Sequence, residues 1–143
     1  MNINKDTLIE NSNVSLDNIA SKLNIEKPVV LYDDFFALST GGNPYGSKTI
    51  HLNDNPENYD ILVAVIYENS YTCACLIPGG NWGKTTIKRA RIMTRYFNQY
   101  FQLSTVDNNN NVTAWFEGDT PIPDGTNVIL HLYGIKTYGG HLY

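Results

Sequence analysis

A glycine-rich stretch at residues 79–85 reads Gly-Gly-Asn-Trp-Gly-Lys-Thr and is the first candidate for chemistry in the chain. A phosphate-binding P-loop needs a glycine five positions before its closing Gly-Lys-Thr, because that glycine lets the backbone wrap the phosphates. Pro78 occupies this position, and Gly79 lies one residue too close. The stretch therefore predicts a turn that carries Trp82, and not a nucleotide site.

A cluster of basic side chains runs through and beyond this turn. Guanidinium groups with aromatic neighbours suit an anionic polymer such as a phosphate-bearing cell-wall glycan. Alternate arginines on an exposed strand also discourage edge pairing, or bridge to acids of a neighbouring subunit. The sequence leaves both interpretations open. The cluster consists of Lys84, Lys88, Arg89, Arg91 and Arg95, with Trp82 and Tyr96 nearby.

Three histidines could in principle ligate a metal, but their spacing does not favour it. His51, His131 and His141 are far apart in the chain, and no pair has the short spacing of a zinc site. His51 and His131 fall in predicted strands, where a partly buried structural side chain is the usual role. We therefore expect no metal and no cofactor.

Carboxylates occur in two pairs that could supply the acid and base of a glycosidase. They are Asp33 with Asp34, and Glu117 with Asp119. Nothing in the sequence places either pair across a cleft, and no Gly-x-Ser-x-Gly nucleophile elbow is present. The sequence names no catalytic residue, and we expect that the protein is not an enzyme.

The two cysteines, Cys73 and Cys75, are two residues apart and would lie on the same face of a strand. Side chains in that arrangement cannot easily form a disulfide with each other. We expect both to be reduced residues of the core.

Composition limits the class of protein and of partner. A chain of 143 residues is long enough for one domain with one core, and its net charge of −4 argues against duplex nucleic acid as a ligand. The longest apolar run, residues 61–67, is far shorter than the roughly 20 residues of a membrane-spanning helix. The first ten residues are polar and lack the pattern of a secretory signal, which predicts synthesis in a cytoplasm.

Residues 1–28 differ from the rest because they contain no aromatic side chain and carry a helical pattern. Ser15 is a suitable N-cap and Pro28 follows the end of the pattern. A helix of about two turns is marginal alone, so its apolar stripe must pack on its own domain, on sister copies or on a larger partner. We interpret residues 1–28 as an anchoring segment. Its apolar positions are Leu16, Ile19, Ala20 and Leu23.

From residue 29 onward, short apolar or alternating runs are bounded by Gly, Pro, Asn and Asp, which is typical of an all-β domain. We predict a domain over residues 29–143 that is an antiparallel, jelly-roll-like β-sandwich preceded by the short N-terminal helix. Residues 85–95 alternate without a purely apolar face, and we favour a strand over a poor helix there. The expected strands are residues 29–32, 35–39, 47–52, 59–68, 71–77, 85–95, 96–106, 112–117 and 128–135.

This series of motifs resembles the C-terminal domain of bacteriophage minor structural and tail-fibre proteins. That family has a Leu-Tyr start, a Gly-rich turn, a short strand, an Asn-Tyr-Asp step into an apolar strand, and a closing Ile-Tyr-Gly-Ile-Lys strand. The match covers residues 29–136. The matching residues are Leu31-Tyr32, the turn at 41–46, the strand at 47–52, Asn58-Tyr59-Asp60, and His131-Leu132-Tyr133-Gly134-Ile135-Lys136.

The resemblance implies a virion protein that is made in the host cytoplasm and assembles as a homotrimer on a head or tail fibre. Only about 28 residues precede the domain where fibres usually carry a long shaft, and residues 137–143 extend past the usual end. These departures predict a small component that attaches to other virion proteins through residues 1–28 and displays the sandwich for assembly or for binding a host-surface glycan.

Ligand contacts are expected on aromatic loops and on the basic cluster, at Tyr45, Trp82, Lys84, Arg89 and Arg91. The main alternative is a lectin-like carbohydrate-binding module, which would share the sandwich, the aromatic side chains and the lack of catalytic residues. A phage depolymerase fragment is a further alternative, and it would require clustered carboxylates that the sequence does not display.

Overall fold

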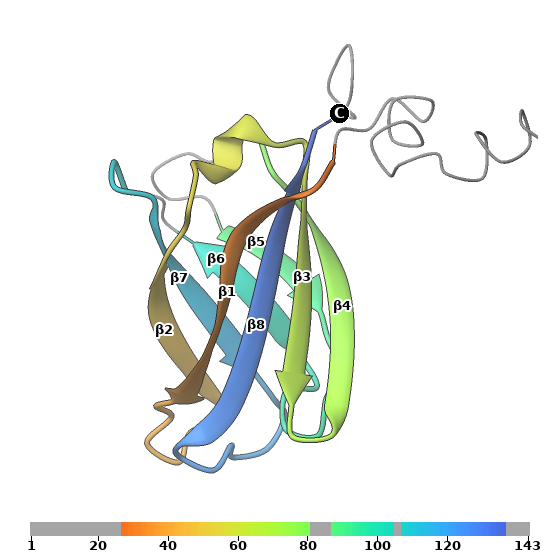
Figure 1. The fold of residues 1–143 in the computed structure, drawn as a ribbon. Coiled ribbons are helices and arrows are strands. Elements are labelled where there is room, and N and C mark those ends of the chain that lie inside the picture. Colours follow the sequence, from red (N-terminus) through yellow and green to blue (C-terminus); the bar gives the residue numbers. More distant parts are fainter. Residues whose placement is uncertain (1–26, 81–86, 105–106, 137–143) are drawn as a thin grey trace, which may run out of the picture.

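The computed structural model describes residues 27–80, 87–104 and 107–136, and within these ranges the chain folds into eight β-strands and one short 3-10 helix (Figure 1). The predicted β-sandwich is confirmed. The predicted N-terminal helix, with Leu16, Ile19 and Leu23, lies outside the described residues. The elements are β1 (Val29–Leu38), β2 (Tyr45–His51), η1 (Pro56–Asn58), β3 (Ile61–Glu68), β4 (Tyr71–Pro78), β5 (Ile87–Arg91), β6 (Tyr100–Ser104), β7 (Asn111–Glu117) and β8 (Thr126–Ile135).

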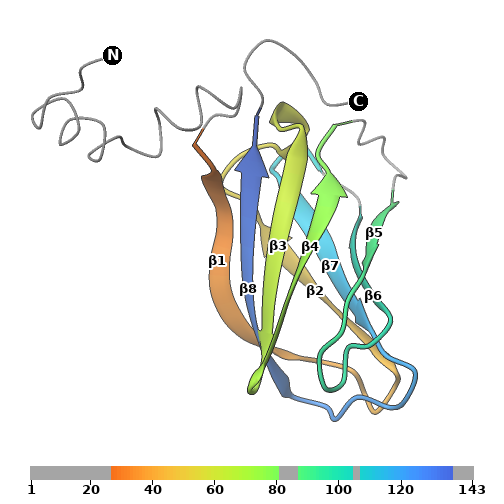
Figure 2. The same cartoon turned by 90° about the vertical axis from the view of Figure 1, so that its right-hand side faces the viewer.

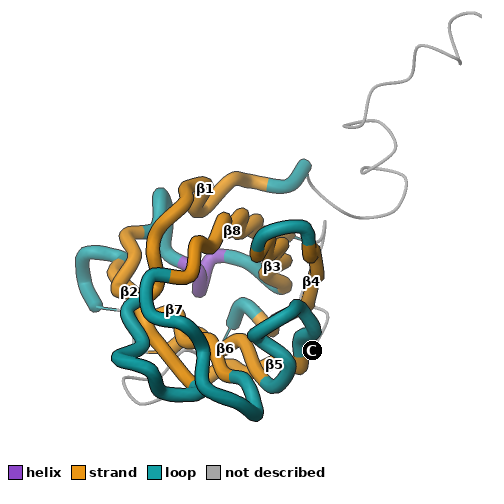
Figure 3. The backbone as a smooth tube through the Cα atoms, turned by 90° about the horizontal axis from the view of Figure 1, so that it is seen from below, coloured by secondary structure: helices purple, strands orange, loops and turns teal. Residues whose placement is uncertain are grey.

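The strands form two four-stranded sheets that pack face to face, as the end-on view in Figure 3 shows. One sheet has the order β1-β8-β3-β4 and the other β2-β7-β6-β5, and all pairings are antiparallel. As in a jelly roll, the first strand pairs with the last, β1 with β8, and the second pairs with the second last, β2 with β7. By contrast, β3 pairs with β4, β5 with β6 and β6 with β7, and each of these pairs joins strands that follow one another in the chain. Figure 2 shows β3 beside β4 and β5 beside β6.

The core lies between the sheets and follows from alternation of side chains along each strand. In β8, for example, Val128, Leu130 and Leu132 are fully buried while the residues between them face outward. Phe36, Phe97 and Phe101 surround the central ring of Phe116, with ring centroids 5.0 to 6.0 Å away. Tilted aromatic packing of this kind stabilises the contact between the two sheets.

The two strands predicted at residues 29–32 and 35–39 are one continuous strand, β1. Its pairing with β8 shifts register between Val30 and Tyr32, which is the signature of a β-bulge. The two predicted segments were separated by the adjacent acids Asp33 and Asp34, but these residues pair with His131 and Leu130 of β8 and belong to the strand.

The turn between β3 and β4 was predicted at the right place, whereas the turn between β5 and β6 was not. Asn69, predicted as part of the turn between β3 and β4, has φ of 53°, in the left-handed region that Asn tolerates. The strands predicted at 85–95 and 96–106 were extended too far, because β5 ends at Arg91 and β6 begins at Tyr100. Between them Thr94 closes a turn: its backbone N–H donates to the Phe97 carbonyl, and its Oγ1 accepts the Phe97 N–H.

Candidate functional site

The outer surface of the sheet β2-β7-β6-β5 carries aromatic and charged side chains in cross-strand rows, and we name it the polar–aromatic face. Register places Tyr45, Glu117, Tyr100 and Arg91 in one row. A second row, one pleat along, contains Ser47, Trp115, Gln102 and Arg89. Residues two apart on a strand point to the same side, so both rows face outward from the core.

Arg89 is held in place by its neighbour in the second row. Its Nε and Nη2 groups both donate to Oε1 of Gln102, at 3.0 and 2.9 Å. Arg91 is held by Gln99, because the Nη1 group of Arg91 donates to Oε1 of Gln99 at 3.0 Å. Each guanidinium has five N–H donors, so both keep donors for a ligand.

The ring of Tyr100 contacts both arginines. The Cζ atom of Arg89 is 4.7 Å from the ring centroid and that of Arg91 is 5.2 Å away, within the range of cation–π contact. The two Cζ atoms are therefore no more than about 10 Å apart. Among the described residues neither guanidinium forms an ion pair with a carboxylate. Two fixed positive charges at this spacing can bind a phosphate or carboxylate group of a ligand.

An aromatic pair occupies the other end of the face. The rings of Tyr45 and Trp115 are stacked, with centroids 4.7 Å apart and an angle of 13° between their planes. Trp115 Nε1 donates to Oε2 of Glu117 at 3.1 Å, which fixes the indole on β7. Flat rings held in this way are suited to stacking against the apolar face of a sugar.

Loops at the end of the face hold the first row in position. The N–H of Gly118 donates to the carbonyl of Pro44 at 2.8 Å, directly before Tyr45. A Cβ on Gly118 would lie 2.2 Å from the Tyr96 carbonyl oxygen, so no larger residue fits without a shift. Asn98 and Asp119 exchange two hydrogen bonds of 2.8 Å across the same region. These contacts connect both edges of the face.

A hollow of about 340 Å³ opens beside Arg91, between β4 and the loop that follows β5. Cys73 and Ala74 form one side, and Ile92, Met93 and Asn98 form the other. It lies beside Arg91 at the edge where the two sheets meet, because β4 and β5 are edge strands of different sheets.

The structure brings together three of the residues predicted as ligand contacts. Tyr45, Arg89 and Arg91 share the polar–aromatic face although they come from strands at its opposite edges. Trp82 and Lys84 lie outside the described residues. Tyr100, Gln102 and Trp115 were not predicted from the sequence, and Glu117 was considered only as a candidate catalytic carboxylate. Their alternation within predicted strands was a signal that they face outward, but the pairing of the strands was needed to unite them.

Groupings expected for other functions can be checked within the described ranges. No cluster of three or more His, Cys, Asp or Glu side chains that could hold a metal ion is found in this part of the chain. No helix among the described residues is long and apolar enough to cross a membrane. The two acid pairs of the sequence lie on different sheets. Asp33 forms an ion pair with His131 within the sheet β1-β8-β3-β4, while Glu117 lies on the polar–aromatic face of the other sheet.

Comparison with known proteins adds no relative. No family model, no curated protein and no solved structure matches the chain.

Proposed function

We propose that the protein is a non-catalytic component of a phage virion that uses the polar–aromatic face to bind an anionic glycan of the host surface. The resemblance of residues 29–136 to fibre-tip domains supports the virion setting. In this setting residues 1–28 attach the protein to other virion proteins, and sister copies assemble as a homotrimer.

The observation that carries the proposed ligand is the pair of arginines around Tyr100. Arg89 and Arg91 are fixed by neutral glutamine side chains and not by carboxylates, so their charge is not neutralised within the sheet. The stacked rings of Trp115 on β7 and Tyr45 on β2 lie two and three strands away from the arginines of β5, and strands are about 4.8 Å apart. A chain of sugars joined by phosphate groups presents ring faces and negative charges at comparable intervals, and this class of ligand fits both parts.

A lectin-like module of a bacterium remains the second candidate, because the same face suits a free-standing sugar-binding domain. The two differ in where the protein is found. Antibody against the protein should label purified phage particles in electron micrographs if it is a virion component. Failure to label the particles would overturn the virion setting and favour the lectin-like module.

The ligand is tested by affinity electrophoresis in gels that contain either a teichoic acid whose backbone is poly(N-acetylglucosamine 1-phosphate) or uncharged dextran. We expect retardation by the teichoic acid that weakens as salt is raised, since fixed charges contribute most at low ionic strength. Arg89→Gln and Arg91→Gln should each weaken binding about tenfold, the order of one charge-assisted hydrogen bond.

Lys48→Gln is the matched control, because it removes one exposed positive charge from β2, away from the two arginines. It should leave binding unchanged. Equal losses in all three variants would mean that only net charge matters, and absence of retardation in the wild-type protein would overturn the proposed ligand.

A further inference from the structure

The outer surface of the other sheet, β1-β8-β3-β4, is almost entirely apolar, and we name it the apolar face. Register places its outward side chains in rows across the four strands. Phe35, Ile129, Tyr67 and Thr72 form one row, and Val30, Tyr133, Val63 and Leu76 form another. Ile135, Ile61 and Pro78 continue it towards the end of the sheet.

The large side chains of this face are open to solvent in the single chain. Phe35 on the edge strand β1 is 66% exposed, and Leu76 on the other edge strand, β4, is 65% exposed. Val30, Tyr67 and Ile129 are also exposed. Contiguous apolar surface of this extent on a soluble protein marks a contact site.

The sequence of β3 supports the same conclusion. It reads Ile-Leu-Val-Ala-Val-Ile-Tyr-Glu, and its inward residues Leu62, Ala64 and Ile66 fill the core. Its outward residues, Val63 and Val65, are equally apolar. A sheet with one solvated face normally alternates apolar with polar, whereas strands covered on both faces read as continuous apolar runs.

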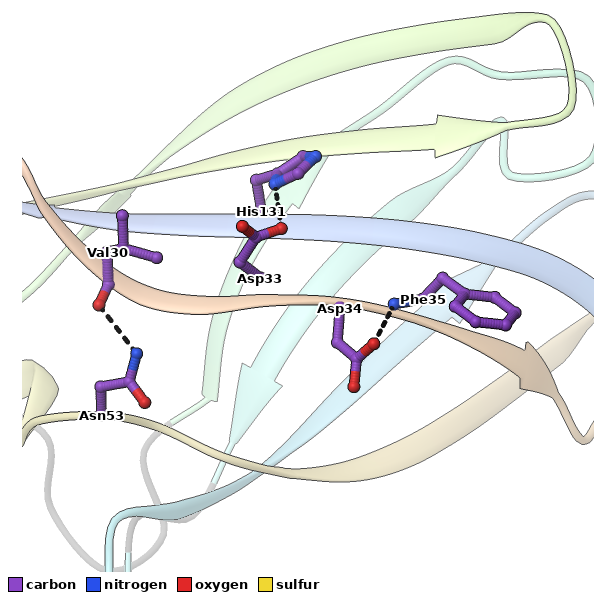
Figure 4. Close-up of polar contacts among 6 residues, drawn as sticks. All are labelled: Val30, Asp33, Asp34, Phe35, Asn53 and His131. Carbon is purple, nitrogen blue, oxygen red and sulfur yellow. Dashed lines mark hydrogen bonds and ion pairs between the residues drawn. The ribbon is translucent and has the colours of Figure 1, made fainter.

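One polar pair lies within the face and is satisfied internally. Asp33 on β1 and His131 on β8 form a contact of 2.7 Å between Oδ1 and Nδ1, as Figure 4 shows. His131 also packs edge-on against Tyr67, with ring centroids 5.5 Å apart. Because each partner already contacts the other, this pair can be covered by a neighbouring molecule at lower cost than a lone charge.

The size of the face indicates what covers it. Four strands at about 4.8 Å and eight residues at about 3.3 Å give a projected area of roughly 500 Å². The accessible area is larger because side chains stand out from the sheet, and a stable protein interface buries about 800 Å² on each partner. The apolar face is thus of the order needed for a protein partner.

The apolar stripe predicted in the N-terminal segment is too short to cover the whole face. The stripe predicted from Leu16 to Leu23 would form a helix of about 12 Å in length and 10 Å in width, which covers roughly a quarter of the face. A second copy of the domain offers a sheet of the same size, twist and apolar character. In the proposed homotrimer the three copies would turn this face toward a common threefold axis, so that each copy divides its apolar face between two neighbours.

We propose that the apolar face of β1-β8-β3-β4 is the interface between copies of this chain. An apolar recess of about 240 Å³ at one end, lined by Pro28, Val63, Tyr133 and Ile135, would receive a side chain of the neighbouring copy. This inference names the surface through which the assembly of the proposed function forms and rests on that part of it, while the glycan site lies on the opposite sheet.

Multi-angle light scattering of the full chain over a range of concentrations tests the interface. The wild-type mass should be at least twice the protomer mass. Leu76→Lys and Phe35→Lys place a charge on the face at exposed positions, and each should weaken association about a hundredfold or more. Thr49→Lys is the control, since Thr49 is exposed on the opposite sheet, and it should associate like the wild type.

A monomeric wild type at about 100 μM would overturn the interface, as would lysine variants that keep the wild-type mass and melting temperature. If deletion of residues 1–26 turned a monomer into an oligomer, the chain's own segment would be the occupant and the proposal would be wrong. Teichoic acid binding measured on the same variants separates the two proposals, because loss of association with retained binding, or the reverse, affects only one of them.

Discussion

Arg89 and Gln102 face each other across β5 and β6, and a single oxygen of the glutamine accepts two hydrogen bonds from the guanidinium. Gln102 is buried beneath Arg89. Two bonds to one acceptor hold the plane of the guanidinium, so its remaining N–H groups keep one direction. Gln102 is thus a positioning residue for the proposed ligand contact of Arg89.

Replacement of Gln102 by Leu should weaken teichoic acid binding several-fold while Arg89 itself is retained. Leu has a similar volume, and the freed guanidinium can be hydrated, so the free energy of unfolding should change by less than about 1 kcal/mol. Affinity electrophoresis and urea unfolding measure the two effects. Thr113→Val, on β7 of the same sheet, is the control and should leave both unchanged. Unchanged binding in Gln102→Leu would show that Arg89 needs no positioning.

Glu68 should make the protein less stable as pH rises. Its side chain is fully buried at the end of β3, and its carboxylate oxygens have no hydrogen-bond partner among the described residues. Burial raises its pKa, and the amides of Arg95 and Tyr96 and the charge of Arg95 only partly offset this. The amides act at a distance, without forming hydrogen bonds of ordinary geometry.

The sign follows from linkage. Since the folded-state pKa lies above the unfolded one, the folded protein holds the proton more tightly, and this stability is lost as pH rises through the folded pKa. Glu68→Gln should therefore be more stable than the wild type at pH 8, by about 1 kcal/mol or more, and the difference should vanish near pH 4. Urea unfolding across this range tests it, with exposed Glu57→Gln as control. A constant difference at all pH values would contradict the titration of Glu68.

The hydrogen bond between Tyr59 and Asp54 should contribute to stability with the opposite dependence on pH. Its hydroxyl donates to Oδ2 of Asp54 at 2.7 Å, and this bond is the largest of several contacts that lower the pKa of Asp54. A depressed carboxyl pKa contributes stability that is present at neutral pH and is lost as pH falls through the folded pKa. Tyr59→Phe should destabilise the protein by about 1 kcal/mol at pH 7 and by less at pH 3. Thermal unfolding at both pH values checks this, and an equal loss at both would assign the effect to packing of the ring.

The hairpin of β3 and β4 could be predicted from the sequence because its information is local. An apolar run, the turn residues Asn69 and Ser70, and a second apolar run specify one strand reversal. The single strand β1 could not be predicted, because two adjacent acids, Asp33 and Asp34, interrupt the apolar pattern, and only their pairing with β8 shows that the strand continues through them.

The candidate site could be predicted only in part because it depends on pairing between distant segments. The chemical types of Tyr45, Arg89 and Arg91 identified them as ligand candidates. Their common face results from the pairing of β2 with β7 and of β6 with β7, over separations that no local pattern reports. Trp115 and Tyr100 join the site through the same pairings, so no isolated sequence motif identifies them as part of it.

The two cysteines should differ in reactivity from each other and from free thiols. Both side chains point inward from β4: Cys75 lies in the core and Cys73 packs against it. Burial raises the pKa of both thiols, and that of Cys75 reaches about 12, with the neighbouring Cys73 contributing. The thiolate is the reactive form, so roughly one Cys75 in ten thousand is reactive at pH 8. Iodoacetamide followed by mass spectrometry should therefore leave Cys75 unmodified in the folded protein, label Cys73 slowly, and label both at equal rates in guanidinium. Rapid labelling of Cys75 without denaturant would mean that the edge of the sheet at β4 opens readily.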